Sequence, residues 1–205
     1  RNDETRQTLL GGLGETHLRN VVARLERKFG VHVDKEDARV AYRETITGSF
    51  SAEGKYKKQS GGHGQFGIAE IRIEPLPAGS GFEFVDEVRG GVIPRQFIPA
   101  VEAGIMDAMA HGGTSGYPVV DVRAAVFDGK HHAVDSSEMS FKMAGRLAFQ
   151  EALGGARPVV LEPISAVEVT IPSDCLGDVM GDLSSRRATV QGSDMDKWGD
   201  QVISA

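Results

Sequence analysis

Apolar residues near the start of the chain recur at intervals of three and four positions, which is the spacing of one helix face. This pattern predicts an amphipathic helix over about residues 15–29, and Gly30 can end it in a left-handed conformation. One helix with a few extended stretches cannot bury its own faces, so residues 1–45 are expected to be part of a larger domain. The stripe consists of Leu18, Val21, Val22, Leu25 and Phe29.

From residue 46 onward the pattern changes to strands. Isoleucines alternate with charged residues over residues 70–74, which predicts a strand with one buried face and one polar face. A helix is expected from about Pro99, because proline suits the first helical position. A second strand region is expected over residues 117–127, and the Asp-Gly pair at residues 128–129 is typical of a turn.

Another helix is expected to begin at Ser136. Asp135 is its expected N-cap, and Glu138, three residues later, completes a capping box. Met139 and Met143 lie at four-residue spacing and are expected to face the core. The two glycines at residues 154–155 can end this helix.

After residue 157 the pattern predicts a strand, a helix and two further short strands, an order that is typical of part of a ferredoxin-like unit. The predicted fold class is α/β (α+β). It consists of a central two-layer module at residues 46–157, preceded by part of one domain at residues 1–45 and followed by part of another at residues 158–205.

The composition is that of a globular protein, because 40% of the 205 residues are hydrophobic and 25% are charged. A single cysteine, Cys175, excludes an intrachain disulfide framework and favours a cytoplasmic setting. No apolar run approaches the length of a membrane span, so no membrane partner is expected.

The net charge of −6 argues against a dedicated nucleic-acid binder. Two clusters are nevertheless cationic and can contact phosphate: Lys55, Lys57 and Lys58, and the pair Arg186 and Arg187. Edge-strand lysines and cations near a helix C-terminus are common without any ligand.

The chain contains no Walker A sequence. Residues 62–67 match G-x-G-x-x-G, but a strand follows them, so a pyrophosphate would lack a helix N-terminus. A glycine-rich hairpin tip is the better interpretation. Its exposed amides, the preceding lysines, Gln65 and Phe66 suit contact with RNA phosphates and unpaired bases. An ordinary glycine-rich turn without a ligand is the alternative.

A second polar cluster contains His131, His132, Asp135 and Glu138. Adjacent histidines on an extended segment point to opposite faces, and the two carboxylates are explained as helix caps, so no metal site is expected. Ser136 and Ser137 lack the G-x-S-x-G sequence of a nucleophile elbow, so no catalytic residue is expected in this chain.

Several stretches, in order along the chain, resemble elongation factor G. Residues 10–18 (LGGLGETHL) and 41–46 (AYRETI) are similar to its third domain. Residues 59–67 (QSGGHGQFG), 90–94 (GGVIP) and 134–139 (VDSSEM) are similar to its fourth. Residues 161–164 (LEPI) and 176–187 (LGDVMGDLSSRR) are similar to the start of its fifth.

The resemblance implies that the central module resembles domain 2 of ribosomal protein S5 and that the flanking units are ferredoxin-like. It implies a ribosome-binding part of a translational GTPase that promotes tRNA–mRNA translocation by entering the decoding region of the A site. The expected partners are the small-subunit decoding region, the tRNA–mRNA duplex and the large-subunit factor-binding site, and the protein is expected to be monomeric. GTP and Mg²⁺ would belong to an N-terminal domain of the full-length protein, a ribosome-stimulated GTPase, and no cofactor is expected in this chain.

The resemblance also implies that two tip loops would contact RNA, with Gln65 and His132 at the family's contact positions. The loops comprise Ser60, Gly61, Gly62, His63, Gly64, Gln65, Phe66 and Gly67, and His131, His132, Asp135, Ser136 and Ser137.

Three positions near the tip depart from the family pattern. His63 stands where arginine is usual, Phe66 where tyrosine is usual, and Ile68 where histidine is usual. Losing a permanently charged arginine weakens a grip on phosphate. The alternative function is therefore a diverged paralogue that acts in ribosome protection, recycling or rescue. An unrelated dinucleotide- or metal-dependent enzyme is a third hypothesis.

Overall fold

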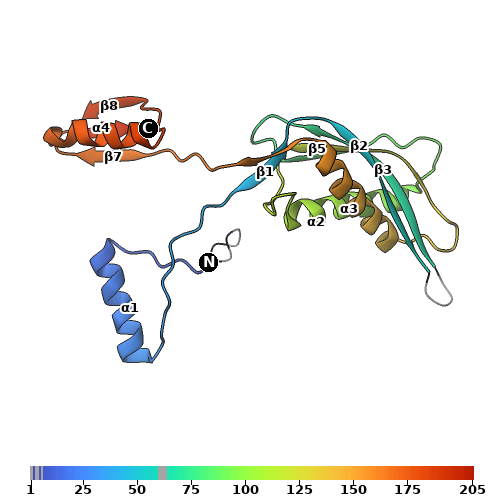
Figure 1. Ribbon diagram of the computed structural model, residues 1–205, viewed down its shortest axis with the longest axis horizontal. Helices are drawn as coiled ribbons and strands as arrows, with labels where there is room; N and C mark the ends of the chain where they lie inside the picture. Colours follow the sequence, from blue (N-terminus) through green and yellow to red (C-terminus); the bar gives the residue numbers. More distant parts are fainter. Residues whose placement is uncertain (1, 3–4, 6, 60–63) are drawn as a thin grey trace. The chain divides into compact units, whose positions relative to one another are not determined.

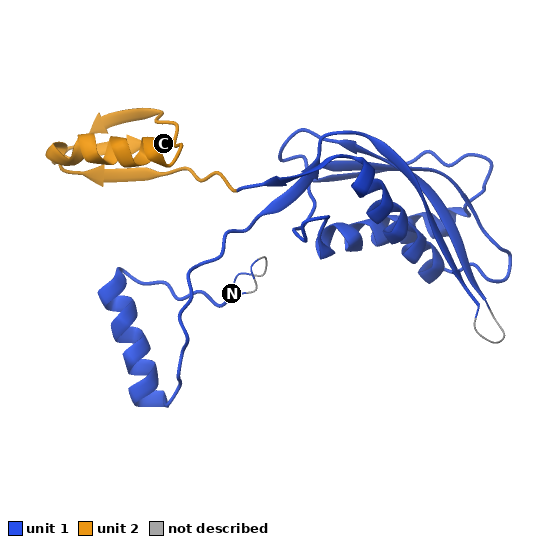
Figure 2. Cartoon of the chain, viewed as in Figure 1, with its two compact units in different colours: residues 1–162 blue, residues 163–205 orange. Residues whose placement is uncertain are grey.

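The structure is a computed structural model, and it describes residues 2, 5, 7–59 and 64–205. The chain divides into two compact units, residues 1–162 and residues 163–205 (Figure 2). Each unit is described by itself below. No helix among the described residues is both long enough and apolar enough to cross a membrane.

Helix α1 (Glu15–Phe29) has the bounds that its apolar stripe predicts. Gly30 ends it with φ of 65°, and its N–H donates to the carbonyl oxygen of Glu26 at 2.9 Å. None of the residues of α1 is buried.

A four-stranded sheet forms the centre of the first unit, in the order β2 (Phe50–Lys58), β3 (Gln65–Pro75), β5 (Val122–Lys130) and β4 (Phe82–Asp86). The first two pairings are antiparallel and the last is parallel. The 3₁₀ turn η1 (Arg95–Phe97) leads into helix α2 (Ile98–His111), which packs with helix α3 (Glu138–Gly155) against one face of the sheet (Figure 1). This arrangement confirms the predicted fold class of mixed α/β with a two-layer centre.

Small residues let α3 approach the sheet and α2 closely. A Cβ at Gly54 would collide with the carbonyl oxygen of Ala144, and one at Gly145 would collide with the carbonyl oxygen of Val101. The core face of α3 therefore carries mainly small residues together with two phenylalanines, and Phe141 stacks on Phe97 with the ring centroids 5.0 Å apart. The predicted core role of Met139 is wrong, because its side chain is 57% exposed. Met143 is only partly buried.

The Asp-Gly pair at residues 128–129 is not a turn but part of β5, which continues to Lys130. The register between β3 and β5 shifts at Glu70/Ile71, so that Phe127 is an extra residue on β5. Gly129 then faces the core, where a Cβ would collide with the carbonyl oxygen of Ile68 and with the side chain of Ile93. Close packing explains this glycine better than turn chemistry does.

A two-stranded ribbon forms the base of the unit, where β1 (Arg43–Ile46) pairs antiparallel with β6 (Pro158–Leu161). The carboxylate of Glu44 is fully buried and accepts hydrogen bonds from the N–H groups of Ser115 and Tyr117, both at 2.9 Å, and from the hydroxyl of Thr114 at 3.2 Å. Strand β1 crosses the boundary expected at residues 45/46, and β6 begins directly after the boundary expected at residues 157/158.

The second unit contains β7 (Glu168–Ile171), the turn η2 (Ser173–Cys175), helix α4 (Leu176–Ser185), β8 (Gly192–Met195) and β9 (Gln201–Ser204). Its sheet has the order β7-β9-β8 and is antiparallel throughout. Leu183 of α4 and Ile203 of β9 are its buried apolar residues. The order strand, helix, strand, strand is the one that the sequence predicts.

Candidate functional site

Two polar loops lie at the end of the central sheet that is remote from β1 (Figure 1). Strands β2 and β3 end their pairing with Lys58 opposite Gln65. Strand β5 ends at Lys130, and residues 131–137 follow it. Four residues predicted for this tip, Ser60, Gly61, Gly62 and His63, lie outside the described residues.

Hydrogen bonds join the two loops directly. The Asp135 carboxylate accepts from the N–H of Gly64 at 3.1 Å, and the Asp135 carbonyl oxygen accepts from the N–H of Phe66 at 2.8 Å. The Ser136 hydroxyl donates to the carbonyl oxygen of Phe66 at 2.8 Å and accepts from the N–H of His132 at 2.8 Å. The predicted neighbourhood of the two loops is therefore confirmed for residues 64–67 and 131–137.

Asp135 does not cap α3, contrary to the sequence prediction. The N-cap is Ser137, whose hydroxyl oxygen accepts from the N–H of Ser140 at 3.2 Å. The carboxylate of Asp135 is instead engaged by Gly64, 71 residues away in the sequence. Both Asp135 and Ser137 are good capping residues, so the local sequence does not decide which of them caps α3. It also gives no sign of a hydrogen-bond partner that is distant in the sequence.

The two histidines serve different parts of the tip. His131 donates from Nδ1 to the carbonyl oxygen of Val92 at 3.0 Å, which attaches the loop between β4 and η1 to the tip. Nδ1 of His132 accepts from the N–H of Asp135 at 3.2 Å and lies 3.3 Å from Asp135 Oδ2. Its ring meets Phe66 edge-on, with the centroids 6.3 Å apart. Among the described residues no group of three or more His, Cys, Asp or Glu side chains is arranged to hold a metal ion.

Gln65 is held by a residue that the sequence analysis did not single out. The hydroxyl of Tyr56 donates to Gln65 Oε1 at 3.0 Å across the β2–β3 pair. The amide oxygen is thereby occupied, and the amide nitrogen of Gln65 remains available as an outward donor. The only local sign was a tyrosine between lysines on β2, and such a tyrosine does not by itself indicate a partner.

The lysines of β2 remain exposed. Lys55, Lys57 and Lys58 form no ion pair with any described residue. Arg186 differs, because its Nε lies 2.7 Å from Asp182 Oδ2, and this hydrogen bond raises the pKa of Arg186. Arg187 follows α4 in the left-handed region, with φ of 63°. Both arginines belong to the second unit, whereas the tip loops belong to the first.

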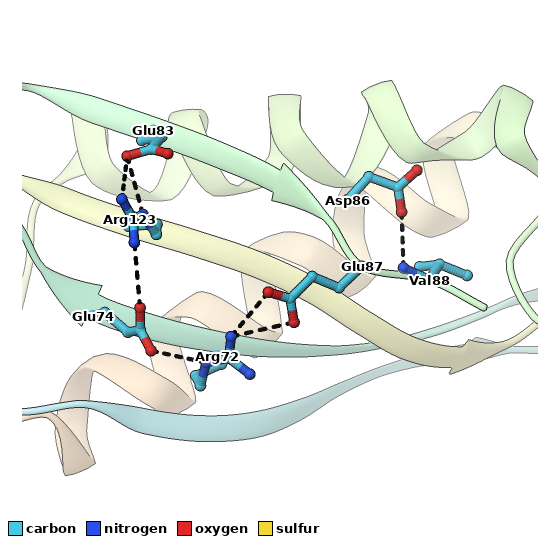
Figure 3. A network of polar contacts seen from close by, with 7 residues as sticks. All are labelled: Arg72, Glu74, Glu83, Asp86, Glu87, Val88 and Arg123. Carbon is cyan, nitrogen blue, oxygen red and sulfur yellow. Dashed lines mark hydrogen bonds and ion pairs between the residues drawn. The ribbon is translucent and has the colours of Figure 1, made fainter.

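The part of the open sheet face around Arg72 and Arg123 carries paired charges (Figure 3). Arg72 contacts Glu74 at 3.0 Å and Glu87 at 3.1 Å, and Arg123 contacts Glu83 at 2.9 Å and Glu74 at 3.8 Å. The hydrogen bond to Glu74, followed by the charge of Glu87, raises the pKa of Arg72. This network leaves little free charge for a ligand, whereas the lysines near the tip keep theirs.

Comparisons with known proteins match the whole chain in order. The model of elongation factor G domain III matches residues 1–37, that of domain IV matches residues 38–157, and that of the elongation factor G C-terminus matches residues 159–205. The chain is also similar to the crystal structure of a protein from Thermus thermophilus, with 41% sequence identity and a TM-score of 0.91. That match covers 100% of this chain and 30% of the other, so this chain spans less than a third of its relative. Because the domain IV match alone covers more than half of the residues, the chain belongs to the elongation factor G family of translation factors.

Proposed function

We propose that this chain is the ribosome-binding part of a translational GTPase that promotes tRNA–mRNA translocation. Its central domain would enter the decoding region of the A site and place the tip against the tRNA–mRNA duplex. The observation that carries this proposal is the joined tip, where Asp135 and Ser136 hold residues 64–67 and 131–137 together at the remote end of the sheet. Membership of the elongation factor G family supports the same role.

The tip is suited to RNA because it offers fixed donors. Tyr56 directs the amide nitrogen of Gln65 outward, and His132 accepts backbone N–H groups through Nδ1, so its neutral form presents Nε2–H. Lys55, Lys57 and Lys58 would meet phosphate oxygens. A tip that is already joined loses less conformational entropy on binding than two separate loops would.

The remaining functional assignments belong to the full-length protein. We propose that it acts in the cytoplasm as a monomer and contacts the large-subunit factor-binding site as well as the decoding region. GTP hydrolysis with Mg²⁺ would take place in its N-terminal domain. Arg186 and Arg187 of the second unit would be phosphate contacts of the full-length protein. Arg186 is already paired to Asp182.

The experiment uses the full-length protein with Gln65 and His132 both replaced by alanine. We expect slower single-round translocation on programmed ribosomes with ribosome-stimulated GTP hydrolysis retained. The free energy of unfolding should change by no more than about 0.5 kcal/mol per exposed site. The matched control replaces Gln150 and His111, residues of the same types that lie exposed on α3 and at the end of α2.

Each outcome is informative. Full translocation by the tip variant would contradict the proposed role of Gln65 and His132, and a large loss of stability would make them structural residues. A wild-type protein that binds ribosomes without moving tRNA would instead point to ribosome protection, recycling or rescue.

A further inference from the structure

Two groups of the loop after β5 compete for the same ring nitrogen of His132. Nδ1 accepts from the backbone N–H of Asp135 at 3.2 Å and, at a longer 3.4 Å, from that of Val134. The same nitrogen lies 3.3 Å from the carboxylate oxygen Oδ2 of Asp135. A ring nitrogen accepts a hydrogen bond only without a proton and donates one only with a proton. One protonation state of His132 therefore satisfies the backbone, and the other satisfies the carboxylate.

The neutral form of His132 closes the loop on itself. With Nδ1 as acceptor, its side chain binds the N–H of Asp135, three residues later in the chain. Its carbonyl oxygen accepts from the N–H of Ser136 at 3.1 Å, and its own N–H donates to the Ser136 hydroxyl at 2.8 Å. The imidazole then acts as an asparagine side chain does in an Asx turn, where a side-chain acceptor binds a backbone N–H a few residues on.

The protonated form exchanges one contact for another. An imidazolium donates from Nδ1, so the N–H of Asp135 loses its acceptor while Oδ2 of Asp135 gains a charged partner. The other oxygen of this carboxylate, Oδ1, accepts from the N–H of Gly64 at 3.1 Å. Asp135 therefore connects the protonation state of His132 to the residue that precedes β3.

The surroundings of His132 leave this exchange to Asp135. From β3 the ring meets Phe66, which carries no charge. Among the described residues, no lysine or arginine pairs with the Asp135 carboxylate, so none competes with His132 for it. The charged and titratable groups on the adjoining elements are Lys58 at the end of β2, Lys130 at the end of β5, the neighbouring His131, and Glu138 at the start of α3.

We propose that His132 and Asp135 form a proton-dependent switch in the loop after β5, in which Nδ1 of His132 binds the backbone when neutral and the Asp135 carboxylate when protonated. Histidine is the side chain whose charge changes between about pH 5 and pH 8. The consequence for RNA rests on the proposed function. A phosphate beside Nε2 of His132 would favour the imidazolium and so move the loop to its second arrangement. Contact with RNA would then be coupled to proton uptake.

The test uses NMR of the whole 205-residue chain at about pH 8 and about pH 5, following the ring nitrogens of His132 and the protection of backbone amides against hydrogen exchange. At the higher pH, Nδ1 should carry no proton and Nε2 should carry one. At the lower pH, the protection factor of the Asp135 amide should fall by up to about tenfold, as expected for the loss of one hydrogen bond. The Phe66 amide should keep its protection, because its acceptor is the carbonyl oxygen of Asp135 at 2.8 Å.

Two variants distinguish the switch from a general loosening of the loop in acid. His132→Asn keeps a side-chain acceptor but does not gain a proton in this range, so the Asp135 amide should be equally protected at both pH values. His111→Asn is the matched control, because it makes the same change at the exposed end of α2, and it should leave the response of the parent chain intact.

A proton on Nδ1 at the higher pH, an Asp135 amide whose protection does not depend on pH, or an equal fall in His132→Asn would each overturn the switch. If the switch fails while the Gln65/His132 double variant is slow in translocation, the switch is wrong and the proposed function stands. If the pH response is as expected while that double variant translocates normally, the switch stands and the proposed role of the tip is wrong.

Discussion

The carboxylate of Asp135 accepts a hydrogen bond from the backbone N–H of Gly64 at 3.1 Å, which ties the loop after β5 to the start of β3. Replacing Asp135 by alanine removes this acceptor and should cost about 0.5–1.5 kcal/mol locally. We expect amide hydrogen exchange at Gly64 to become up to about tenfold faster. Asp135→Asn keeps an acceptor oxygen and should restore much of the protection. Unchanged exchange at Gly64 in Asp135→Ala would contradict the tie.

Ser137, not Asp135, caps helix α3. The capping role of Ser137 and the loop contact of Asp135 can be distinguished by the free energy of unfolding of the two alanine variants. Ser137→Ala removes the acceptor for the N–H of Ser140 and leaves the buried Ser140 hydroxyl without its partner at 3.0 Å. The free energy of unfolding of the central unit should fall by about 0.5–2 kcal/mol in urea titrations. Ser137→Gly tests capping as such, because glycine at an N-cap costs only a few tenths of a kcal/mol relative to serine. A larger loss in Asp135→Ala than in Ser137→Ala would reverse the assignment.

The buried carboxylate of Glu44 organises the loop between α2 and β5. Glu44→Ala would remove the acceptor for the N–H groups of Ser115 and Tyr117, at about 1–3 kcal/mol for each of these hydrogen bonds to a charged group. Chemical denaturation should therefore show a loss of about 2–5 kcal/mol. Glu151→Ala on the exposed side of α3 is the control and should stay within about 0.5 kcal/mol. A Glu44→Ala variant as stable as that control would mean that the loop finds other partners.

The contact between β2 and α3 requires a glycine at residue 54. A methyl group there would collide with the carbonyl oxygen of Ala144, so Gly54→Ala should destabilise the central unit by about 1–3 kcal/mol. Gly154→Ala makes the same chemical change in α3 where a Cβ meets nothing within 4 Å. It should stabilise by about 0.5–1 kcal/mol, because alanine is the better helix former. Thermal unfolding of both variants checks the pair, and a shift of the same sign in both would contradict the close approach.

Predictions that rested on neighbouring residues agree with the structure. The helix over Glu15–Phe29 follows from a stripe of apolar residues on one helix face. Its end follows from Gly30, the residue directly after the stripe. The alternation at Ile71 and Ile73 likewise identifies the buried face of β3, because side chains of a strand point alternately to its two faces.

Predictions that required a choice between two equally good local interpretations did not agree with the structure. Asp-Gly at residues 128–129 suits a turn, but a bulge at Phe127 and the packing of Ile68 and Ile93 keep it in β5. Met139 is apolar and helical, yet the side of α3 that meets the sheet is set by how closely small residues such as Ala144 allow it to approach.

The sequence alone therefore predicted helices near all four helices of the structure and the two-layer centre, because periodicity is a property of consecutive residues, whereas the ribbon of β1 and β6 was not predicted. Only the tertiary structure decided which polar groups meet. Asp135 with Gly64, Tyr56 with Gln65, and Glu44 with the loop after α2 each join residues that come together only after the strands have paired. A hydrogen bond requires two atoms within about 3 Å, and the distance between such atoms is set by strand register and helix packing rather than by the residues on either side of them.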